Sequence, residues 1–437
     1  MILRFFLLII YQLLKGLVIF YQTFYFPFTV FRKRETLDFK GPGIVVSNHP
    51  NTMVDPLHVI SRTPRQSFFL ANASMFKNPI AGFLLKYLYC IPIARPGRDK
   101  GVEKIDNEKS FVATYEHLEK GGVIYIAPEG GSEMERRLRP LKTGTARIAL
   151  GTEARHNFGL GLKIYPAGLT YEHPTRCGSR LYMEAGEPIT VADWQTAYEQ
   201  DPVQAARDMT DHLEEQMRSL LVHTDNDEQD QLLYRLERIV QHDTPLSIDQ
   251  HYDRIQQLLS GLKQLAQNQA DDYGKLQSFV AEYRKALRQN KVTDRGISQQ
   301  DKGLITAISV LAWPLWLYGR LNNIFVYEIP RWLERKMDLY IGYRTTVKVL
   351  GALIAFPLFY FLQYKLVHYL TDSRTAIWYL ISLPLSGIGA WAYAYHVQPR
   401  IEAWQWRQFR KRNPEMAADL TTRRAHLASQ VDNFLRK

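Results

Sequence analysis

The chain has 437 residues, 46% of them hydrophobic, and its 55 Lys and Arg residues against 44 Asp and Glu residues give a formal net charge of +11. This is enough apolar sequence for two or three packed units, which excludes an intrinsically disordered chain. The only two cysteines, Cys90 and Cys177, cannot build a disulfide framework and lie outside metal-ligand spacing, which excludes disulfide-rich secreted scaffolds and zinc fingers.

The charge is unevenly distributed along the chain. Residues 1–200 carry 25 basic and 18 acidic side chains, residues 201–300 carry 12 and 17, and residues 301–437 carry 18 and 9. Nucleic-acid-binding proteins usually gather Lys and Arg on one folded face, so we expect no nucleic-acid partner. Two basic, aromatic-rich ends around an acidic middle favour a protein that meets anionic lipid at a membrane surface.

The N-terminal 31 residues are almost wholly apolar and are followed by three basic residues at 32–34. A membrane core of about 30 Å needs about 20 helical residues, so the segment can span the membrane or lie along its interface. It lacks a small-residue cleavage site, which argues against a removable signal peptide. Six aromatic residues between Phe20 and Phe28 suit headgroup depth. We expect a retained membrane-associated helix, or a helical hairpin, over residues 1–34.

Residues 35–192 alternate between short β-rich runs and helix-length stretches, such as 103–119 and 143–155. Alternation of this kind predicts an α/β domain with a mostly parallel central sheet. The predicted strands are 43–47, 67–71, 89–94, 123–127, 162–169 and 180–184.

Residues 193–300 are polar and rich in Gln and Leu, with few strand signals. Apolar residues at helical spacing predict helices within 248–265 and 276–287, and we expect a loop at 225–231. This pattern indicates an α-helical accessory region that serves packing rather than chemistry.

The last third of the chain is apolar again, and neither 349–364 nor 375–395 contains a charged residue. A short polar turn near residue 372 separates the two runs, which predicts a transmembrane hairpin over 346–398. The apolar part of 301–345 is shorter and contains Pro314, so we expect a re-entrant or interfacial segment there.

Basic residues predict the orientation of this region. Residues 331–348 and the tail at 399–437 are rich in Lys and Arg, which places both in the cytoplasm by the positive-inside rule. A full crossing by residues 303–319 would move the α/β domain to the opposite side. We therefore expect an integral membrane protein whose α/β domain lies on the cytoplasmic face.

The most informative motif is the run Ser-Asn-His-Pro-Asn-Thr-Met-Val-Asp-Pro at 47–56, directly after a predicted strand. A histidine near an aspartate is often only structural. His49, however, lies in a loop after a strand, where neutral imidazole can take a proton from an alcohol near pH 7. Asp55 at the start of the next helix could fix the ring tautomer and stabilise the imidazolium, as in a serine-protease triad whose serine is replaced by a substrate hydroxyl.

A second motif, Ala-Pro-Glu-Gly-Gly-Ser at 127–132, also follows a predicted strand. Its two glycines permit a tight turn and a close approach of the backbone to a ligand, although an ordinary turn would explain them as well. The cations that follow form either a solvated face or a phosphate clamp. They are Arg136, Arg137, Arg139 and Lys142, and Arg95 after strand 89–94 is a further candidate.

Taken in this order, the motifs resemble the glycerolipid acyltransferase family, which carries an Asn-His followed by Asp, an Arg block, a Glu-Gly block ending in Ser, and a Pro-containing strand. The resemblance covers about residues 40–190. The matching residues are Asn48, His49, Asp55, Arg95, the run 128–132 and Tyr165-Pro166-Ala167. It implies an α/β glycerolipid acyltransferase-like domain, here followed by the helical region and the hairpin.

The resemblance also implies a reaction and roles for the motif residues. An acyl group would pass from acyl-CoA or acyl carrier protein to the hydroxyl of a glycerophosphate-type acceptor at the membrane, in phospholipid biosynthesis. It implies that His49 deprotonates the acceptor without an acyl-enzyme and that Asp55 orients His49. It implies no metal and no cofactor, because the thioester donor is a substrate. The implied substrate-binding residues are Arg95, Glu129, Gly130, Gly131, Ser132, Arg136, Arg139 and Lys142.

One spacing departs from the common family pattern. Five residues separate His49 from Asp55, where four are usual, and Pro50-Asn51 looks like a one-residue extension of the loop. This form, together with Pro-Glu-Gly-Gly-Ser, resembles the branch that acylates glycerol-3-phosphate or dihydroxyacetone phosphate. A 1-acylglycerol-3-phosphate acceptor is the alternative.

Two further interpretations compete with an acyltransferase. A serine hydrolase using Ser132 would need a Gly-x-Ser-x-Gly elbow, and the residue two after Ser132 is Met134 rather than glycine. A membrane-anchored scaffold on a degenerate acyltransferase fold is the non-enzyme alternative, and the intact His49, Asp55, Arg95 and Glu129 argue against it.

Overall fold

The fold comes from a computed structural model that describes residues 2–73, 76, 79, 82–83, 85, 89–93, 107–243, 246–299, 310–337 and 340–436. The chain divides into two compact units. Unit 1 consists of Met1–His223 and Tyr340–Thr346, and unit 2 of Thr224–Leu339 and Val347–Lys437.

A mostly parallel sheet forms the centre of unit 1, as the sequence predicts, and strands occur at all six expected places. The strand order is β1-β7-β6-β2-β5-β3-β4, and β8 pairs with β6. Strands β6, β2, β5, β3 and β4 run parallel, whereas β7 is antiparallel to β6. The strands are β1 (Phe28–Arg32), β2 (Gly43–Ser47), β3 (Ser67–Asn72), β4 (Cys90–Ile93), β5 (Val123–Ile126), β6 (Lys163–Tyr171), β7 (Arg180–Ala185) and β8 (Ile189–Thr190).

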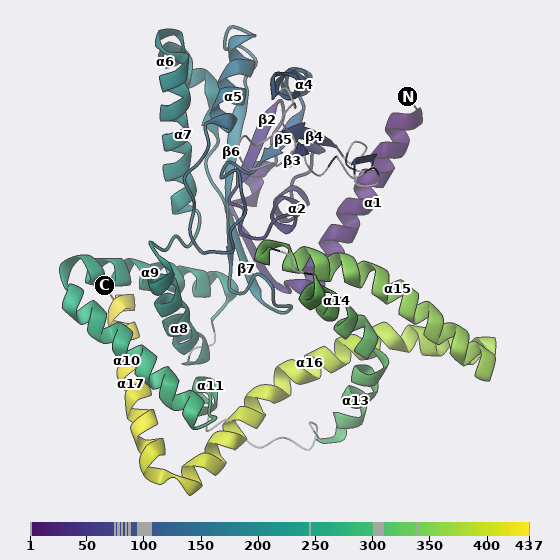
Figure 1. Cartoon of the computed structure of the whole chain (residues 1–437), viewed down its shortest axis with the longest axis vertical. Helices are drawn as coiled ribbons and strands as arrows, with labels where there is room; N and C mark the ends of the chain where they lie inside the picture. Colours follow the sequence, from purple (N-terminus) through teal and green to yellow (C-terminus); the bar gives the residue numbers. More distant parts are fainter. Residues whose placement is uncertain are drawn as a thin grey trace. The chain divides into compact units, whose positions relative to one another are not determined.

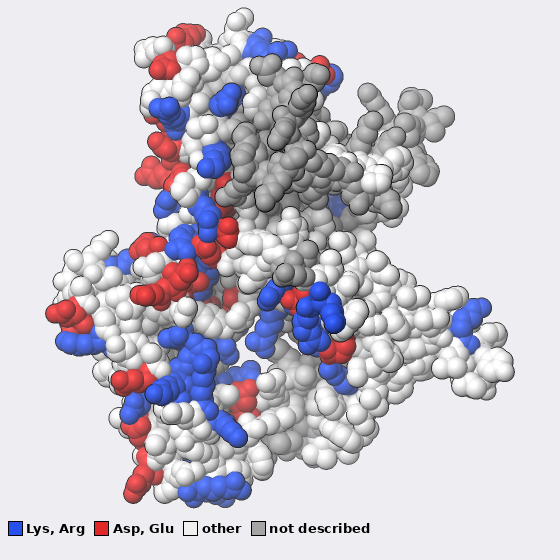
Figure 2. Space-filling model, viewed as in Figure 1, with Lys and Arg blue, Asp and Glu red and all other residues white. Residues whose placement is uncertain are grey.

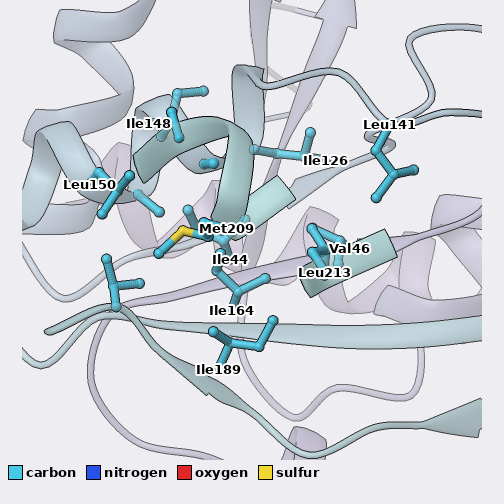
Figure 3. Packing of buried hydrophobic residues seen from close by; sticks show 14 of the residues in the cluster. Ile44, Val46, Ile126, Leu141, Ile148, Leu150, Ile164, Ile189, Met209 and Leu213 are labelled. Atoms are coloured by element: carbon cyan, nitrogen blue, oxygen red, sulfur yellow. The ribbon is translucent and has the colours of Figure 1, made fainter. Parts of the chain in front are cut away.

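Alternating residues of the central strands build a core on each face of the sheet. Ile44 of β2 packs in one core with Ile148 and Met209 (Figure 3), and its neighbour Val45 packs in the other core with Val59. Helices α5 and α7 cover the first face, and α2 covers the second (Figure 1). The helices and 3₁₀ turns of this layer are η1 (Arg34–Leu37), α2 (Val54–Ile60), α4 (Asn107–Glu119), α5 (Gly144–Ala154), η3 (Val191–Trp194), α6 (Gln195–Gln200) and α7 (Pro202–Ser219).

The N-terminal segment differs in part from the expected helix over 1–34. It forms one helix, α1 (Ile2–Tyr25), and not a hairpin, and then β1, which pairs in parallel with β7 along the sheet. The apolar run hides this change because Phe-Thr-Val-Phe-Arg suits a strand as well as a membrane segment. Gln22 of α1 donates hydrogen bonds to the carbonyl oxygen of Leu57 and to Ser61, at 3.2 and 3.0 Å. One face of α1 therefore packs on the α/β fold.

Unit 1 also extends beyond the expected boundary at residue 192. A Cβ atom on Gly168 of β6 would lie 2.2 Å from the carbonyl oxygen of Leu220, so glycine permits a very close approach of the chain that follows α7. The backbone N–H of Val222 then donates to the Thr170 hydroxyl at 3.0 Å. Part of the predicted accessory region thus belongs to the α/β unit.

In unit 2, helices α8 (Asp227–Asp243), α9 (Ile248–Asn268), α10 (Ala270–Gln289) and α17 (Pro414–Arg436) pack together. The helices predicted within 248–265 and 276–287 are confirmed, but the predicted loop at 225–231 is wrong because α8 begins at Asp227. Asn226 accepts a hydrogen bond from the N–H of Gln229, and three acidic residues occupy the first turn. A polar cap and acidic side chains stabilise a helix start, which outweighs the low apolar content there.

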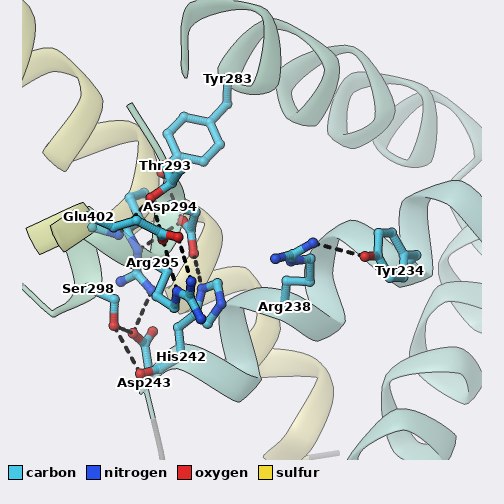
Figure 4. Close-up of polar contacts among 12 residues, drawn as sticks. Tyr234, Arg238, His242, Asp243, Tyr283, Thr293, Asp294, Arg295, Ser298 and Glu402 are labelled. Atoms are coloured by element: carbon cyan, nitrogen blue, oxygen red, sulfur yellow. Dashed lines mark hydrogen bonds and ion pairs between the residues drawn. The ribbon is translucent and has the colours of Figure 1, made fainter. Parts of the chain in front are cut away.

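A buried polar cluster joins these helices to α11 (Asp294–Ser298) (Figure 4). Asp294 lies 2.8 Å from Nδ1 of His242 and accepts hydrogen bonds from Tyr283 at 2.9 Å and Arg424 at 3.0 Å. Arg424 also bonds Asp243 at 2.5 Å. Burial alone would raise the pKa of Asp294, but the His242 hydrogen bond and the Arg424 charge lower it below the ordinary value.

The predicted hairpin corresponds to α15 (Arg344–Leu370) and α16 (Ser373–Arg412), with Asp372 capping α16 through the N–H groups of Arg374 and Thr375. Among the described residues, three helices are long and apolar enough to cross a membrane: Leu7–Tyr25, Ile341–Leu370 and Ser373–Arg412. The surface along the α15–α16 arm is nearly free of charge in Figure 2, apart from basic side chains near its tip.

Two shorter helices, α13 (Trp313–Asn322) and α14 (Ile324–Lys336), precede the hairpin. Residues 303–309 of the expected re-entrant segment lie outside the described residues. The buried Asn323 between α13 and α14 accepts a hydrogen bond from Tyr360 at 2.6 Å and donates to the carbonyl oxygen of Leu383 at 3.2 Å. A polar side chain thus links α13, α15 and α16.

Candidate functional site

The two motifs meet at one edge of the sheet in unit 1. His49 follows β2 and Glu129 follows β5, and these strands are adjacent and parallel. Because the carboxyl ends of parallel strands share an edge, ligands in open α/β sheets usually bind there. The N–H of His49 donates to Oε1 of Glu129 at 2.6 Å, which joins the two motifs directly.

His49 and Asp55 lie side by side, with Nδ1 of the ring 3.2 Å from Oδ2 of the carboxylate. The Asp55 side chain is fully buried, whereas 20% of the His49 side chain is exposed. Asp55 also accepts hydrogen bonds from the N–H of Asn51 and the hydroxyl of Tyr171, each at 2.6 Å. The carboxylate is therefore held from two sides, and the ring keeps an accessible edge.

The loop between His49 and Asp55 takes an uncommon backbone conformation at Thr52. Its φ of 43° lies in the left-handed region, which is rare for a β-branched residue. The N–H of Thr52 donates to Oγ of Ser132 at 3.0 Å, so the second motif supports the loop at this point. With this turn, α2 still begins where Asp55 can reach the imidazole.

Asn48 anchors the start of the loop at residues 48–55, called here the catalytic loop because it holds the candidate base His49 and its candidate partner Asp55. Its amide group donates to the carbonyl oxygen of Leu169 at 2.9 Å and accepts from the N–H of Leu169 at 2.7 Å. The preceding Ser47 contacts the Tyr125 hydroxyl at 2.6 Å. The asparagine of the Asn-His pair thus fixes the loop to β6.

Glu129 is buried and uses both carboxylate oxygens on backbone groups. Besides the His49 N–H, it accepts the N–H of Arg139 at 3.1 Å. Burial raises its pKa to about 7, although the two N–H donors and the nearby His49 oppose that shift. Its position supports the loops on both sides of the site, and the substrate-binding role that the resemblance implies stays a prediction.

The cationic segment after Glu129 pairs partly with its own carboxylates. Arg139 lies 2.7 Å from Glu135 and 3.8 Å from Glu133, and Arg137 lies 2.8 Å from Glu135. These residues belong to the loop at 133–142, called here the arginine loop, which carries four basic and two acidic side chains. Its two carboxylates pair with Arg137 and Arg139. An anionic ligand would have to compete with these carboxylates for the guanidinium groups.

A tight turn brings the arginine loop back to the motif. Gly130 has a φ of 67°, a conformation that favours glycine, and the N–H of Lys142 donates to the carbonyl oxygen of Pro128 at 2.8 Å. The Lys142 side chain is exposed, whereas Gly131, Ser132 and Arg136 are partly buried. Arg95 lies outside the described residues.

Helix α7 and the segment that follows it support the arginine loop through two side chains that the sequence motifs do not include. The N–H of Leu138 donates to Nδ1 of His223 at 3.0 Å, and the N–H of Leu141 donates to Glu214 at 2.9 Å. Tyr171, which bonds Asp55, was also missed. It is the last residue of β6, and only the alternation of side chains along that strand could have placed it on this side.

In the described part of the chain, no group of three or more His, Cys, Asp or Glu side chains is arranged to hold a metal ion. The two hydrogen-bonded loops instead offer a base, an oriented carboxylate and cationic side chains. Such a set can take a proton from a hydroxyl group and hold an anion.

The segment that carries both motifs matches a known protein family. The model of the Acyltransferase family matches residues 29–170. Two Saccharomyces cerevisiae proteins are similar: glycerol-3-phosphate O-acyltransferase 2 is 41% identical over 92 residues, or 21% of this chain, and glycerol-3-phosphate O-acyltransferase 1 is 33% identical over 126 residues, or 28%. An uncharacterised acyltransferase of Schizosaccharomyces pombe is 37% identical over 92 residues, or 21% of this chain.

These similarities are local. The matched segments span 12, 16 and 14% of the three yeast proteins. Among solved structures, the 1-acyl-sn-glycerophosphate acyltransferase PlsC of Thermotoga maritima has 17% identity and a TM-score of 0.33, covering 44% of this chain and 70% of that protein.

Proposed function

We propose that the chain moves a fatty acyl group from a thioester donor to glycerol-3-phosphate or a closely related acceptor. The match of residues 29–170 to the Acyltransferase family and the local similarity to two yeast glycerol-3-phosphate O-acyltransferases support this proposal. The donor is acyl-CoA or acyl carrier protein, and the acylated product enters phospholipid synthesis. The observation that carries the proposal is the contact of His49 with the buried Asp55 beside the arginine loop.

In the proposed reaction, His49 is the general base. Its Nδ1 faces Asp55, so Nε2 receives the proton of the acceptor hydroxyl while the oxygen attacks the thioester carbonyl. The tetrahedral intermediate collapses, the C–S bond breaks, and the thiol leaves with the proton from His49. Asp55 fixes the tautomer and stabilises the imidazolium. General-base help is worth about 10²–10⁴-fold in rate.

Positioning of the two substrates supplies the larger part of the acceleration, on the order of 7–11 kcal/mol at best. We assign the acceptor phosphate to Arg136, Arg139 and Lys142, with Arg95 as a further contact. The phosphate then replaces Glu135 as the partner of Arg139. Glu129, with the turn at Gly130 and Gly131 and the bond from Thr52 to Ser132, keeps the two loops in register.

No cofactor takes part in this scheme, because transfer from a thioester needs only a base and correct positioning. We further propose that the enzyme is integral to a membrane, with the acyltransferase domain on the cytoplasmic face. The support is the apolar α15 and α16 and the basic residues at 331–348 and 399–437.

The test measures incorporation of labelled acyl-CoA into lipid by membranes that contain the full chain, with glycerol-3-phosphate as acceptor. His49→Ala should lower the rate by at least about 10²-fold. His156→Ala, at an exposed site in unit 1, is the matched control and should retain the wild-type rate. Equal incorporation by wild type and His49→Ala would remove the catalytic role and leave the scaffold interpretation.

A panel of acceptors then identifies the substrate. Glycerol-3-phosphate, dihydroxyacetone phosphate and 1-acylglycerol-3-phosphate share a phosphate but differ in the neighbouring groups. The highest kcat/KM should fall on glycerol-3-phosphate. A preference for the 1-acyl compound would assign the chain to the second acylation step instead.

A further inference from the structure

A short segment from the C-terminal half of the chain packs on the catalytic loop. Residues 340–346, called here the strap, belong to unit 1 although they lie far outside the matched stretch at 29–170. They comprise η4 (Ile341–Tyr343) and the first turn of α15. Gly342, Thr345 and Thr346 are buried, as expected for a segment that packs against its own unit.

The first anchor of the strap is Thr52. The Thr52 hydroxyl donates to the carbonyl oxygen of Gly342 at 2.9 Å and lies 3.1 Å from the Thr346 hydroxyl. Thr52 has a left-handed φ, a conformation that costs on the order of 1–3 kcal/mol. Such a conformation persists only when surrounding contacts enforce it, and the strap supplies two of those contacts.

A second anchor lies on the other side of the loop. The carbonyl oxygen of Pro174 accepts hydrogen bonds from the Asn51 amide at 3.0 Å and from the Thr345 hydroxyl at 2.9 Å. Asn51 in turn donates its backbone N–H to Asp55. The strap and the catalytic loop therefore share one acceptor next to the catalytic carboxylate.

The third anchor reaches the arginine loop. The Tyr340 hydroxyl donates to Glu133 at 2.5 Å, and Glu133 lies 3.8 Å from Arg139. The backbone N–H of Arg139 bonds Glu129, which accepts the N–H of His49. Tyr340 thus contacts a carboxylate that competes with an anionic ligand for Arg139.

We propose that the strap is a positioning element of the active site, which holds Thr52 and Asn51 so that Asp55 reaches His49 and holds Glu133 beside Arg139. This inference rests on the proposed function for its kinetic consequences, while its structural consequence is independent of the reaction. The recognised acyltransferase segment is incomplete without it. Since α15 begins at Arg344, the chain that enters the apolar hairpin starts from residues that hold the catalytic loop.

Gly342 offers a sharp test. A Cβ atom there would lie 2.8 Å from Cγ2 of Thr52 and 2.9 Å from Cε1 of Tyr340, so Gly342→Ala should push the strap away from the loop. Displacement of a catalytic group by about 1 Å can cost about 10²-fold, so we expect kcat to fall by about 10- to 100-fold. The KM for the donor should change little, and amide exchange in the peptide covering 48–55 should rise by about tenfold.

A second substitution distinguishes positioning from general loss of stability. Thr52→Ser removes the methyl group that Gly342→Ala would strike but keeps the hydroxyl that bonds the strap. The double variant should therefore recover most of the kcat and of the exchange protection lost in Gly342→Ala. Gly274→Ala is the glycine control, because a Cβ there meets nothing within 4 Å.

The outcomes separate the two proposals. Unchanged amide exchange at 48–55 in Gly342→Ala would overturn the positioning role of the strap. Equal losses of kcat and of exchange protection in the single and double variants would also overturn it. If the wild-type chain transfers no acyl group to any acceptor, the proposed function fails. Amide exchange in Gly342→Ala, the double variant and Gly274→Ala then tests the positioning role of the strap by itself. An equal increase in exchange across all of unit 1 would indicate unfolding and would also count against a local positioning role.

Discussion

The Asp55 carboxylate is held by three contacts with neighbouring groups. It contacts the His49 ring, the Asn51 N–H and the Tyr171 hydroxyl, and two of these groups are donors that need an acceptor. An amide at this position would turn an NH₂ group towards one of them. Asp55→Asn should therefore misplace the imidazole as well as remove the charge, and we expect kcat to fall by about 10²–10⁴-fold.

The measurement is the initial rate of acyl transfer at saturating donor, compared with Tyr171→Phe. The phenylalanine variant removes one neutral hydrogen bond and keeps the charge, so it should lose about tenfold or less. A larger loss in Tyr171→Phe than in Asp55→Asn would show that the tyrosine, and not the carboxylate, supports the base.

Glu129 gives a prediction about pH. Its pKa rises to about 7 in the folded chain from about 4.5, mainly through burial. The folded state thus keeps a proton that the unfolded state releases, so the unfolding free energy falls as pH rises from about 4.5 to about 7. The total contribution is up to about 3 kcal/mol.

Glu129→Gln removes this titration, and its amide faces two backbone N–H donors where the carboxylate accepted both. We expect a lower melting temperature at pH 5 and a smaller decline between pH 5 and 7 than in wild type. Thermal unfolding in detergent at a series of pH values tests this. Parallel pH curves for the two proteins would exclude the raised pKa.

Much of this site can be predicted from sequence, but only where the interacting residues are neighbours in the chain. His49 and Asp55 lie within one loop, so the sequence predicts their contact, and their proposed roles follow from acid–base properties. Tyr171 and Asp55 are 116 residues apart, and Thr52 and Gly342 are 290 apart, so only folding brings them together. The contacts of Glu129 go to backbone N–H groups, which no side-chain pattern encodes.

At the scale of elements, the polar cluster around Asp294 is the feature most sensitive to substitution. It links α8, α10, α11 and α17 through His242, Tyr283 and Arg424, all of them partly or fully buried. Asp294→Asn would leave Arg424 with less compensating charge. Breaking a buried ion pair such as Arg424–Asp294 costs about 3–5 kcal/mol, so we expect a clear drop in the melting temperature of unit 2.

The control for Asp294→Asn is Glu282→Gln, which removes the exposed pair of Glu282 with Arg423 at 3.8 Å. Exposed pairs contribute about 0–1 kcal/mol, so this variant should melt like wild type. Because the pKa of Asp294 is lowered, its stabilisation should be present above its unfolded pKa and lost as pH falls through its folded pKa. Equal melting of both variants would show that the cluster contributes little.

The elements also show which sequence signals are reliable. The six predicted strands lie where short runs rich in apolar residues, many of them β-branched or aromatic, stand between turn signals. β1 was missed because it continues an apolar helix without a break in composition. The start of α8 was missed because capping by Asn226 stabilises it, and capping depends on one side chain rather than on a periodic pattern.

At the scale of the molecule, the hairpin offers two helices that are long and apolar enough to cross a membrane. α15 has 27 residues and is about 40 Å long, enough to cross a core of about 30 Å. α16 has 40 residues and is about 60 Å long, so it can cross and continue into the basic stretch that ends at Arg412. The two ends of the hairpin should therefore lie on the cytoplasmic side and its turn on the other.

Single cysteines in a background without Cys90 and Cys177 test this arrangement in sealed inside-out vesicles. An impermeant maleimide should label Ser429→Cys in α17 and Glu116→Cys in α4, both exposed positions, but not Ser373→Cys at the hairpin turn. Glu116→Cys reports on which side of the membrane the acyltransferase domain lies. All three should react after detergent is added, which controls for buried thiols. Labelling of Ser373→Cys in sealed vesicles would show that α15 and α16 do not cross as a hairpin. Protection of Glu116→Cys alone would place the acyltransferase domain on the opposite side of the membrane.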